Sequence, residues 1–99
     1  MQIPAPIAFV AADGDVLINF GIFAGREVTA AEIEELARAL LGYVESVTVV
    51  AENRFVADRD TEALVHQIRI EVGDGDAAQL LPIAERWASA CVAERPTEF

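Results

Sequence analysis

The sequence contains no lysine, and its seven basic residues, all arginines, face seventeen aspartates and glutamates. The formal net charge is therefore −10 at pH 7. Proteins that bind nucleic acids or anionic membrane surfaces need positive charge gathered on one face. We therefore expect neither nucleic acid nor a membrane among the partners of this chain, and its charge also repels acidic macromolecules.

Cysteine and long apolar runs are scarce as well. Cys91 is the only cysteine, so no internal disulfide can form. No apolar run approaches the ~20 residues that a membrane-spanning helix needs. The start, MQIPAPIAFVAADGD, has no basic residue and is interrupted by proline, which makes it a poor secretory signal. These absences predict a soluble cytoplasmic protein.

The chain has 99 residues, of which 54% are hydrophobic. This length corresponds to one domain, and we expect a single domain over residues 1–99 with loose termini at 1–5 and 96–99. A domain of this size buries only roughly two thirds of its unfolded surface. Dimer formation is therefore a natural way to bury more apolar surface.

Four segments have the pattern of β-strands. Residues 7–12 and 16–23 are apolar runs around Asp-Gly-Asp, which is typical of a tight hairpin turn. Residues 45–58 are rich in β-branched side chains, and residues 62–72 alternate between two faces. The polar stretch DRDT at 58–61 predicts a turn between them. In the last strand, one face carries Leu64, His66, Ile68 and Ile70, and the other carries Val65, Gln67, Arg69 and Glu71.

Two segments have helical periodicity. Thr29 and Glu32 have the spacing of a capping box, and an apolar stripe follows them up to Leu41. The second segment runs from 77 to 95 after Asp76, a suitable N-cap. Proline inside a helix removes a backbone hydrogen bond and clashes with the preceding turn. Either a short turn at 77–81 leads into a helix that begins at Pro82, or the helix is kinked there, and we expect the first.

The element order β-β-α-β-β-α predicts an α+β protein. From residue 16 onward it matches a ferredoxin-like fold that lacks its last strand. The handedness of crossovers leaves one position between strands 16–23 and 45–58, and strand 62–72 fits it, antiparallel to both. We expect a ferredoxin-like two-layer sandwich: a four-stranded antiparallel sheet with two helices on one face, and an extra N-terminal strand in place of the missing one.

The first candidate ligand site is the strand-to-helix corner at Gly25, Arg26 and Thr29. A helix N-terminus attracts anions, Gly25 would allow close approach, and Arg26 could pair with a carboxylate or phosphate. However, Glu27 would repel an anion, Thr29 already serves as a cap, and the phosphate-loop motif is missing. An ordinary corner with a solvated arginine is the competing interpretation.

Other chemistry-bearing residues lack suitable partners. His66 is the only histidine, and its strand position favours a structural place at the rim of the core, with ligand binding as the alternative. Cys91 lies on the apolar stripe of the last helix, where a thiol is unreactive. We expect no metal and no cofactor, because aspartate is favoured in turns for backbone reasons and each acidic cluster coincides with a turn: Asp13/Asp15, Asp58/Asp60/Glu62 and Asp74/Asp76.

Two functional hypotheses follow from the lack of a catalytic constellation. The first is a small non-catalytic interaction or ligand-binding module. It would be a homodimer through the open sheet face, and its interface residues would be Leu17, Phe23 and Arg69. Sheet edges look less suitable, because charged residues such as Glu52 and Arg54 guard the third strand against edge pairing. The alternative is a small enzyme or sensor that binds an anionic metabolite at the Gly25-Arg26-Thr29 corner, with His66 as a further contact.

Overall fold

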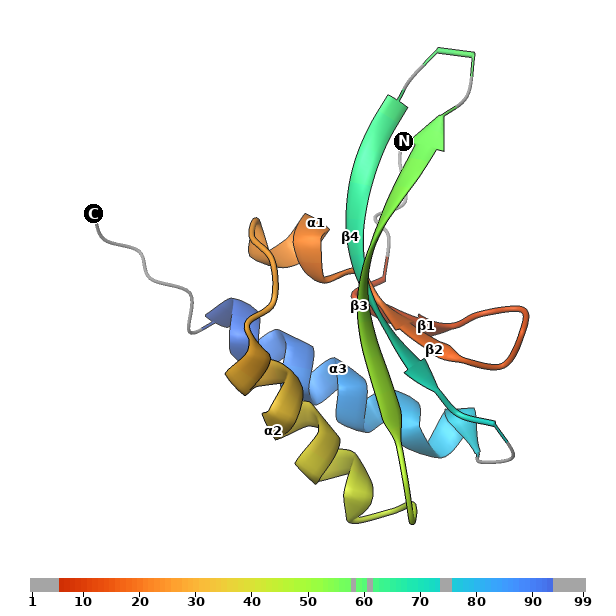
Figure 1. Ribbon diagram of the computed structural model, residues 1–99, viewed down its shortest axis with the longest axis vertical. Coiled ribbons are helices and arrows are strands. Elements are labelled where there is room, and N and C mark those ends of the chain that lie inside the picture. Colours follow the sequence, from red (N-terminus) through yellow and green to blue (C-terminus); the bar gives the residue numbers. More distant parts are fainter. Residues whose placement is uncertain (1–5, 58, 61, 74–75, 94–99) are drawn as a thin grey trace.

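The computed structural model describes residues 6–57, 59–60, 62–73 and 76–93 (Figure 1). Within these residues the chain forms a small α+β fold with a four-stranded antiparallel open sheet and three helices. The termini that were expected to be loose, 1–5 and 96–99, lie outside the described residues. In chain order the elements are β1 (Ala8–Val10), β2 (Val16–Ile18), α1 (Phe20–Ala24), α2 (Ala30–Leu41), β3 (Thr48–Ala57), β4 (Glu62–Glu71) and α3 (Ala77–Ala93).

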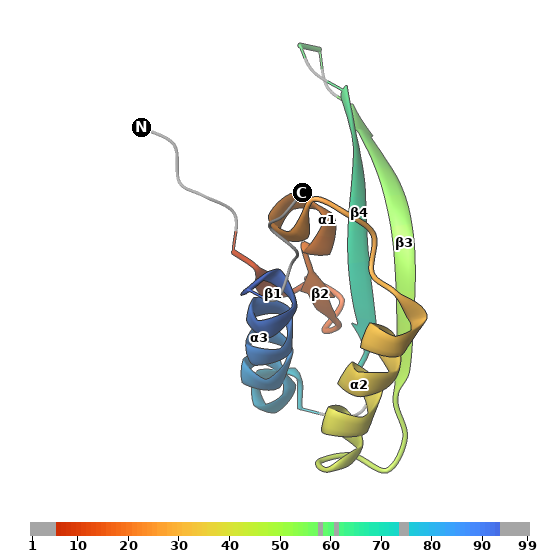
Figure 2. The same cartoon turned by 90° about the vertical axis from the view of Figure 1, so that its left-hand side faces the viewer.

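The sheet has the strand order β1-β2-β4-β3, with antiparallel pairing throughout. β4 therefore lies between β2 and β3, as the crossover argument predicted. β2 is short and pairs only with residues 68–70 of β4, whereas β3 pairs with β4 along its whole length. Residues 53–57 and 62–66 consequently form a two-stranded ribbon without a third strand, and we call this ribbon the hairpin arm. In Figures 1 and 2 it rises past α1.

The strand predicted at 16–23 is wrong beyond Ile18, because the chain turns into the short helix α1. Asn19 is buried at the junction. Its amide donates to the Pro6 carbonyl at 2.7 Å and accepts from the Gln67 amide at 2.8 Å. The run from Phe20 is apolar at nearly every position, so it has no period that separates helix from strand. Gly25, with φ 72°, ends α1 in the left-handed conformation that glycine adopts readily.

α2 begins at the predicted capping box, which is confirmed. The Thr29 hydroxyl accepts from the Glu32 backbone N–H at 3.2 Å, and the Glu32 carboxylate accepts from the Thr29 N–H at 2.9 Å. Two helix N–H groups that would otherwise lack partners are thereby satisfied. The helix buries its apolar stripe through Leu36 and Leu40, both fully shielded from solvent.

α3 starts at Ala77, so the prediction of a start at Pro82 is wrong. The Asp76 carboxylate accepts from the Ala78 N–H at 3.1 Å and caps the first turn, as predicted. Leu80 lies ahead of the proline and is buried in the core. The burial of that turn outweighs the single hydrogen bond that Pro82 removes near the helix start.

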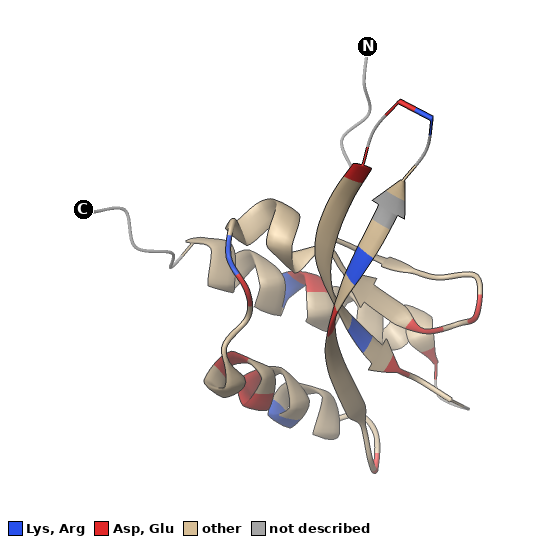
Figure 3. Cartoon of the chain, turned by 45° about the horizontal axis from the view of Figure 1, so that its top comes forward, with Lys and Arg blue, Asp and Glu red and all other residues tan. Residues whose placement is uncertain are grey.

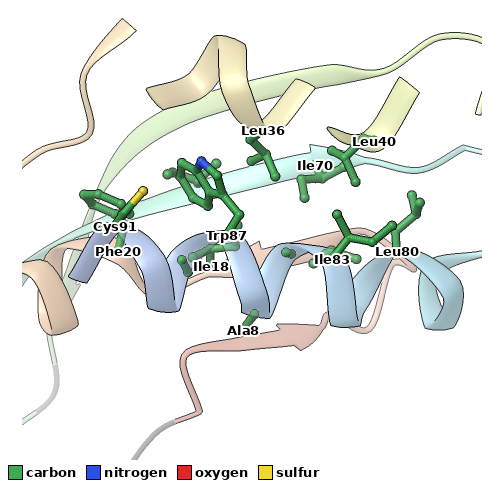
Figure 4. Packing of buried hydrophobic residues seen from close by; sticks show 14 of the residues in the cluster. Ala8, Ile18, Phe20, Leu36, Leu40, Ile70, Leu80, Ile83, Trp87 and Cys91 are labelled. Carbon is green, nitrogen blue, oxygen red and sulfur yellow. The ribbon is translucent and has the colours of Figure 1, made fainter. Parts of the chain in front are cut away.

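The hydrophobic core combines residues of α2 and α3 with one face of β2 and β4 (Figure 4). Ile68 and Ile70 lie on this face and are fully buried. Trp87 of α3 packs against Phe20 of α1, with ring centroids 5.6 Å apart. This contact packs the short helix α1 against the core. We call the sheet face that carries Ile68 and Ile70 the core side and the opposite face the polar side.

Candidate functional site

The predicted corner site consists of side chains that bind one another. Arg26 donates two hydrogen bonds to the Glu32 carboxylate, Nη2 to Oε2 at 2.6 Å and Nη1 to Oε1 at 2.9 Å. The guanidinium carbon also lies 5.3 Å from the centre of the Phe20 ring, a cation–π distance. A bidentate arginine–carboxylate pair is among the strongest polar contacts in proteins. The cation that would attract a metabolite therefore already has a carboxylate partner.

Electrostatics at the corner follow from this pair. The hydrogen bonds from Arg26, with further ones from Thr29, lower the pKa of Glu32 to about 2. The same pair raises the pKa of Arg26. Both groups are thus held in their charged forms over the whole physiological range. Two of the three predicted corner residues, Arg26 and Thr29, thus contact a carboxylate of the chain itself, and Gly25 is exposed.

His66 joins this corner to the base of the hairpin arm. Its Nε2 accepts from the Val28 backbone N–H at 3.3 Å, and its Nδ1 lies 3.1 Å from the Asn53 side-chain oxygen. These contacts fit a neutral ring with its proton on Nδ1. The ring also meets Phe20 edge-on, with centroids 6.3 Å apart. Both ring nitrogens therefore have a partner, and His66 connects β4 to the Phe20 ring of α1 and to the backbone of the corner.

Gly21 allows α1 to come this close to β4. A Cβ atom at this position would lie 2.8 Å from the His66 Cβ and 3.1 Å from its carbonyl oxygen. The absence of a side chain at residue 21 is therefore a requirement of the packing. Sequence reasoning missed this role, because Gly21 stood inside a segment that was interpreted as a strand.

The polar side of the sheet is occupied by contacts within the chain. Arg69 donates to Asp13 and Asp15, each at 3.0 Å, and lies 3.7 Å from Glu52. These contacts raise the pKa of Arg69, the hydrogen bond to Asp15 being the largest cause. Leu17 pairs with Arg69 in the sheet and is only 3% exposed. Phe23, the third predicted interface residue, is half-buried on α1 and is not part of the sheet.

The most exposed large apolar side chains lie on the hairpin arm. Phe55 and Leu64 face each other across β3 and β4 and are 66% and 70% exposed. Both belong to the core side of the sheet, on the part of the β3–β4 hairpin that extends beyond its pairing with β2. Ile22 of α1, 58% exposed, adds a third apolar side chain nearby. We call Ile22, Phe55 and Leu64 the arm surface.

A groove runs between α1 and β4 beside the arm surface. Its volume is about 430 Å³, and Ile22 and Leu64 form its apolar walls. Gly21, Arg26, Glu27 and His66 also line it. Such a groove accommodates one or two side chains of a partner. The sequence indicated Leu64 as a strand residue on the core side, but it could not reveal that this side chain is 70% exposed beside a groove.

Cys91 is buried, as predicted. Burial and then the nearby Glu32 carboxylate raise the pKa of its thiol to about 12, so the thiolate that a nucleophile requires does not form near neutral pH. Within the described residues, no group of three histidines, cysteines or carboxylates is arranged to hold a metal ion. Asp13 and Asp15 instead bind Arg69, and Asp58 and Asp74 lie outside the described residues. None of the described helices is long and apolar enough to cross a membrane.

Comparisons of this chain with family models, with curated proteins and with solved structures find no match.

Proposed function

We propose that this chain is a non-catalytic interaction module that uses the arm surface to bind a partner. The exposure of Phe55 and Leu64 carries the proposal: two large apolar side chains face each other on a ribbon that, among the described residues, pairs with no third strand. A two-stranded ribbon alone is marginally stable in water, and apolar pairs on it favour a covering partner. The groove beside Ile22 supplies a pocket for an anchoring side chain.

The charge of the chain favours a partner segment that combines apolar and basic side chains. The net charge is −10, and the exposed carboxylates of Glu27 and Glu62 border the groove and the arm surface. A cationic segment is attracted by this field, whereas an acidic one is repelled. The occupant we propose is an apolar segment of a protein partner with arginine or lysine at its flanks.

An anionic metabolite at Gly25-Arg26-Thr29 has less support. Arg26 would have to give up a bidentate pair with Glu32, and the carboxylate left behind would repel the incoming anion. For the fold, we propose a variant of the ferredoxin-like sandwich in which α2 and α3 cover the core side. The strand order β1-β2-β4-β3 and the burial of Ile68 and Ile70 support it.

A displayed peptide library selected on the immobilised protein tests the proposed function. We expect selected peptides to contain an apolar anchor flanked by basic residues, and their affinity to fall as salt is added. Leu64→Ser should weaken their binding by at least about tenfold, since an anchoring leucine contact is worth about 1.5–3 kcal/mol.

Leu41→Ser is the matched control, because Leu41 is also a leucine, is 48% exposed and lies on α2, away from the arm. The control should bind the selected peptides like the wild type. Peptides that bind Leu64→Ser as tightly as the wild type, or a selection that yields no binder, would contradict the proposed function.

A further inference from the structure

The outer edge of β3 is a second unoccupied feature of the hairpin. β3 is the last strand in the order β1-β2-β4-β3, and its ten residues pair on one side only. Among the described residues, no backbone hydrogen bond outside the β3–β4 ladder involves β3. A long edge with unpaired N–H and C=O groups is a template for another strand, and proteins protect such edges or use them.

The charges on β3 match those of a second β3 strand that runs antiparallel to it. Glu52 and Arg54 are the only charged residues of the strand, and they stand on either side of Asn53. A two-fold axis normal to the sheet at Asn53 places Glu52 opposite Arg54 of the second copy, and Arg54 opposite its Glu52. Opposite charges at directly facing positions stabilise a strand pair, and like charges destabilise it.

The same two residues exclude the neighbouring registers. With an axis normal to the sheet, paired residues share a face, so the register can shift only by moving the axis to another residue. An axis at Glu52 would place two glutamates opposite each other, and an axis at Arg54 would do the same with two arginines. Only the axis at Asn53 forms two attractive pairs. The charges that were expected to guard the edge thus select one partner and one register.

We propose that two copies of this chain pair through the outer edges of β3, with the two-fold axis at Asn53. The pairing covers residues 49–57 of each copy, about 30 Å of strand at 3.4 Å per residue, and joins the sheets into one of eight strands. A two-fold contact of this kind closes on itself and does not propagate. This interface goes beyond the proposed function and is independent of it, because edge pairing uses the backbone of β3 and leaves open the strand face that carries Phe55 and Leu64. It also replaces the open sheet face as the proposed homodimer surface.

Charge reversal in two separate variants tests the register. Glu52→Arg places two arginines opposite each other twice in the dimer, and Arg54→Glu does the same with glutamates. Each variant alone should dimerise at least about tenfold more weakly than the wild type in sedimentation velocity. Mixed in equal amounts, the two variants should form a heterodimer as tightly as the wild-type dimer, since each of the two facing pairs then joins an arginine to a glutamate. Native mass spectrometry distinguishes the heterodimer by its mass.

Two controls separate the interface from folding and from the proposed function. Glu34→Arg reverses a charge on the exposed face of α2 and should leave dimerisation unchanged. The double variant Glu52→Arg/Arg54→Glu should recover the homodimer, which a misfolded chain cannot do. A wild type that stays monomeric at high micromolar concentration, or variants that fail to recover on mixing, would overturn the proposed pairing. Peptide binding at the arm surface should persist in the monomeric variants. Failure of the dimer proposal and failure of the proposed function can therefore be told apart.

Discussion

At the residue scale, Glu32 connects more elements than any other charged side chain of the corner. It caps α2 through Thr29, holds Arg26 against the Phe20 ring and contributes to the raised pKa of Cys91. The sequence revealed only the first of these roles, because the capping box is a local motif. The pair with Arg26 depends on the turn of α1, which the sequence did not indicate.

This carboxylate should make the stability of the protein depend on pH. The pKa of Glu32 is about 2 in the folded chain, against an ordinary value of 4.5, so its contribution is complete above pH 4.5 and is lost as pH falls toward 2. Glu32→Gln should lower the free energy of unfolding by about 2 kcal/mol near pH 7. The difference from wild type should shrink steadily between pH 4.5 and pH 2 in urea unfolding. Glu34→Gln is the exposed control, and a pH-independent effect of Glu32→Gln would contradict this role.

Gly21 is a residue at which one methyl group should matter. Gly21→Ala places a Cβ 2.8 Å from the His66 Cβ, and neither backbone can yield easily. We expect a loss of about 1–2 kcal/mol in the free energy of unfolding, even though alanine favours helices more than glycine. Gly42→Ala is the matched control, since its nearest contact would be 3.5 Å and its φ of −70° suits any residue. Equal stabilities of the two variants would show that α1 does not press against β4.

At the scale of elements, the success of sequence reasoning depended on periodicity. α2 has a cap and a 3.6-residue stripe, and β4 alternates strictly, so both were predicted at nearly their observed bounds. α1 has no period, and its helix depends on the buried Asn19 amide and on the fit of Gly21 against His66. Pro82 shows the reverse case: a strong local signal for a helix start is overridden by the burial of Leu80.

The candidate surfaces were harder to predict than the elements. Leu64 and Phe55 lie on the core side by parity, and in most sheets such residues are covered. They lie where β3 and β4 extend beyond β2, which pairs only with residues 68–70 of β4, and the length of that pairing is a tertiary fact. Arg69 was expected at an interface with a second copy, and it binds Asp13 and Asp15 of its own chain. The sequence indicated that Arg69 is charged, but Asp13 and Asp15, which bind it, lie more than fifty positions away in the chain.

At the scale of the whole molecule, negative charge is spread over strands, turns and helices (Figure 3). With a net charge of −10 and a pI near 4.3, the folded chain repels itself at neutral pH. Added salt screens this repulsion, and it also weakens the exposed ion pairs of Arg69 and Arg38.

Because acidic residues are in excess, we expect the screening of their repulsion to stabilise the fold more than the weakening of ion pairs destabilises it. We expect the melting temperature of the dilute protein to rise by about 2–4 °C between 20 mM and 300 mM sodium chloride. Differential scanning calorimetry at low micromolar concentration measures this shift without a contribution from dimers. Sodium sulfate at equal ionic strength controls for surface exclusion effects. A fall in melting temperature would mean that the arginine ion pairs contribute more than the repulsion removes.

The strand order also fixes when the sheet can be completed during synthesis. β1 and β2 leave the ribosome first, yet β2 finds its second neighbour only in β4, and fifty positions separate Ile18 from its partner Ile68. Only residues 58–61 separate β3 from β4 in the sequence, so these two strands can pair locally. The β1–β2 hairpin can therefore pair with β4 only after β4 has been translated. α3, translated after both hairpins, packs against β1 and β2.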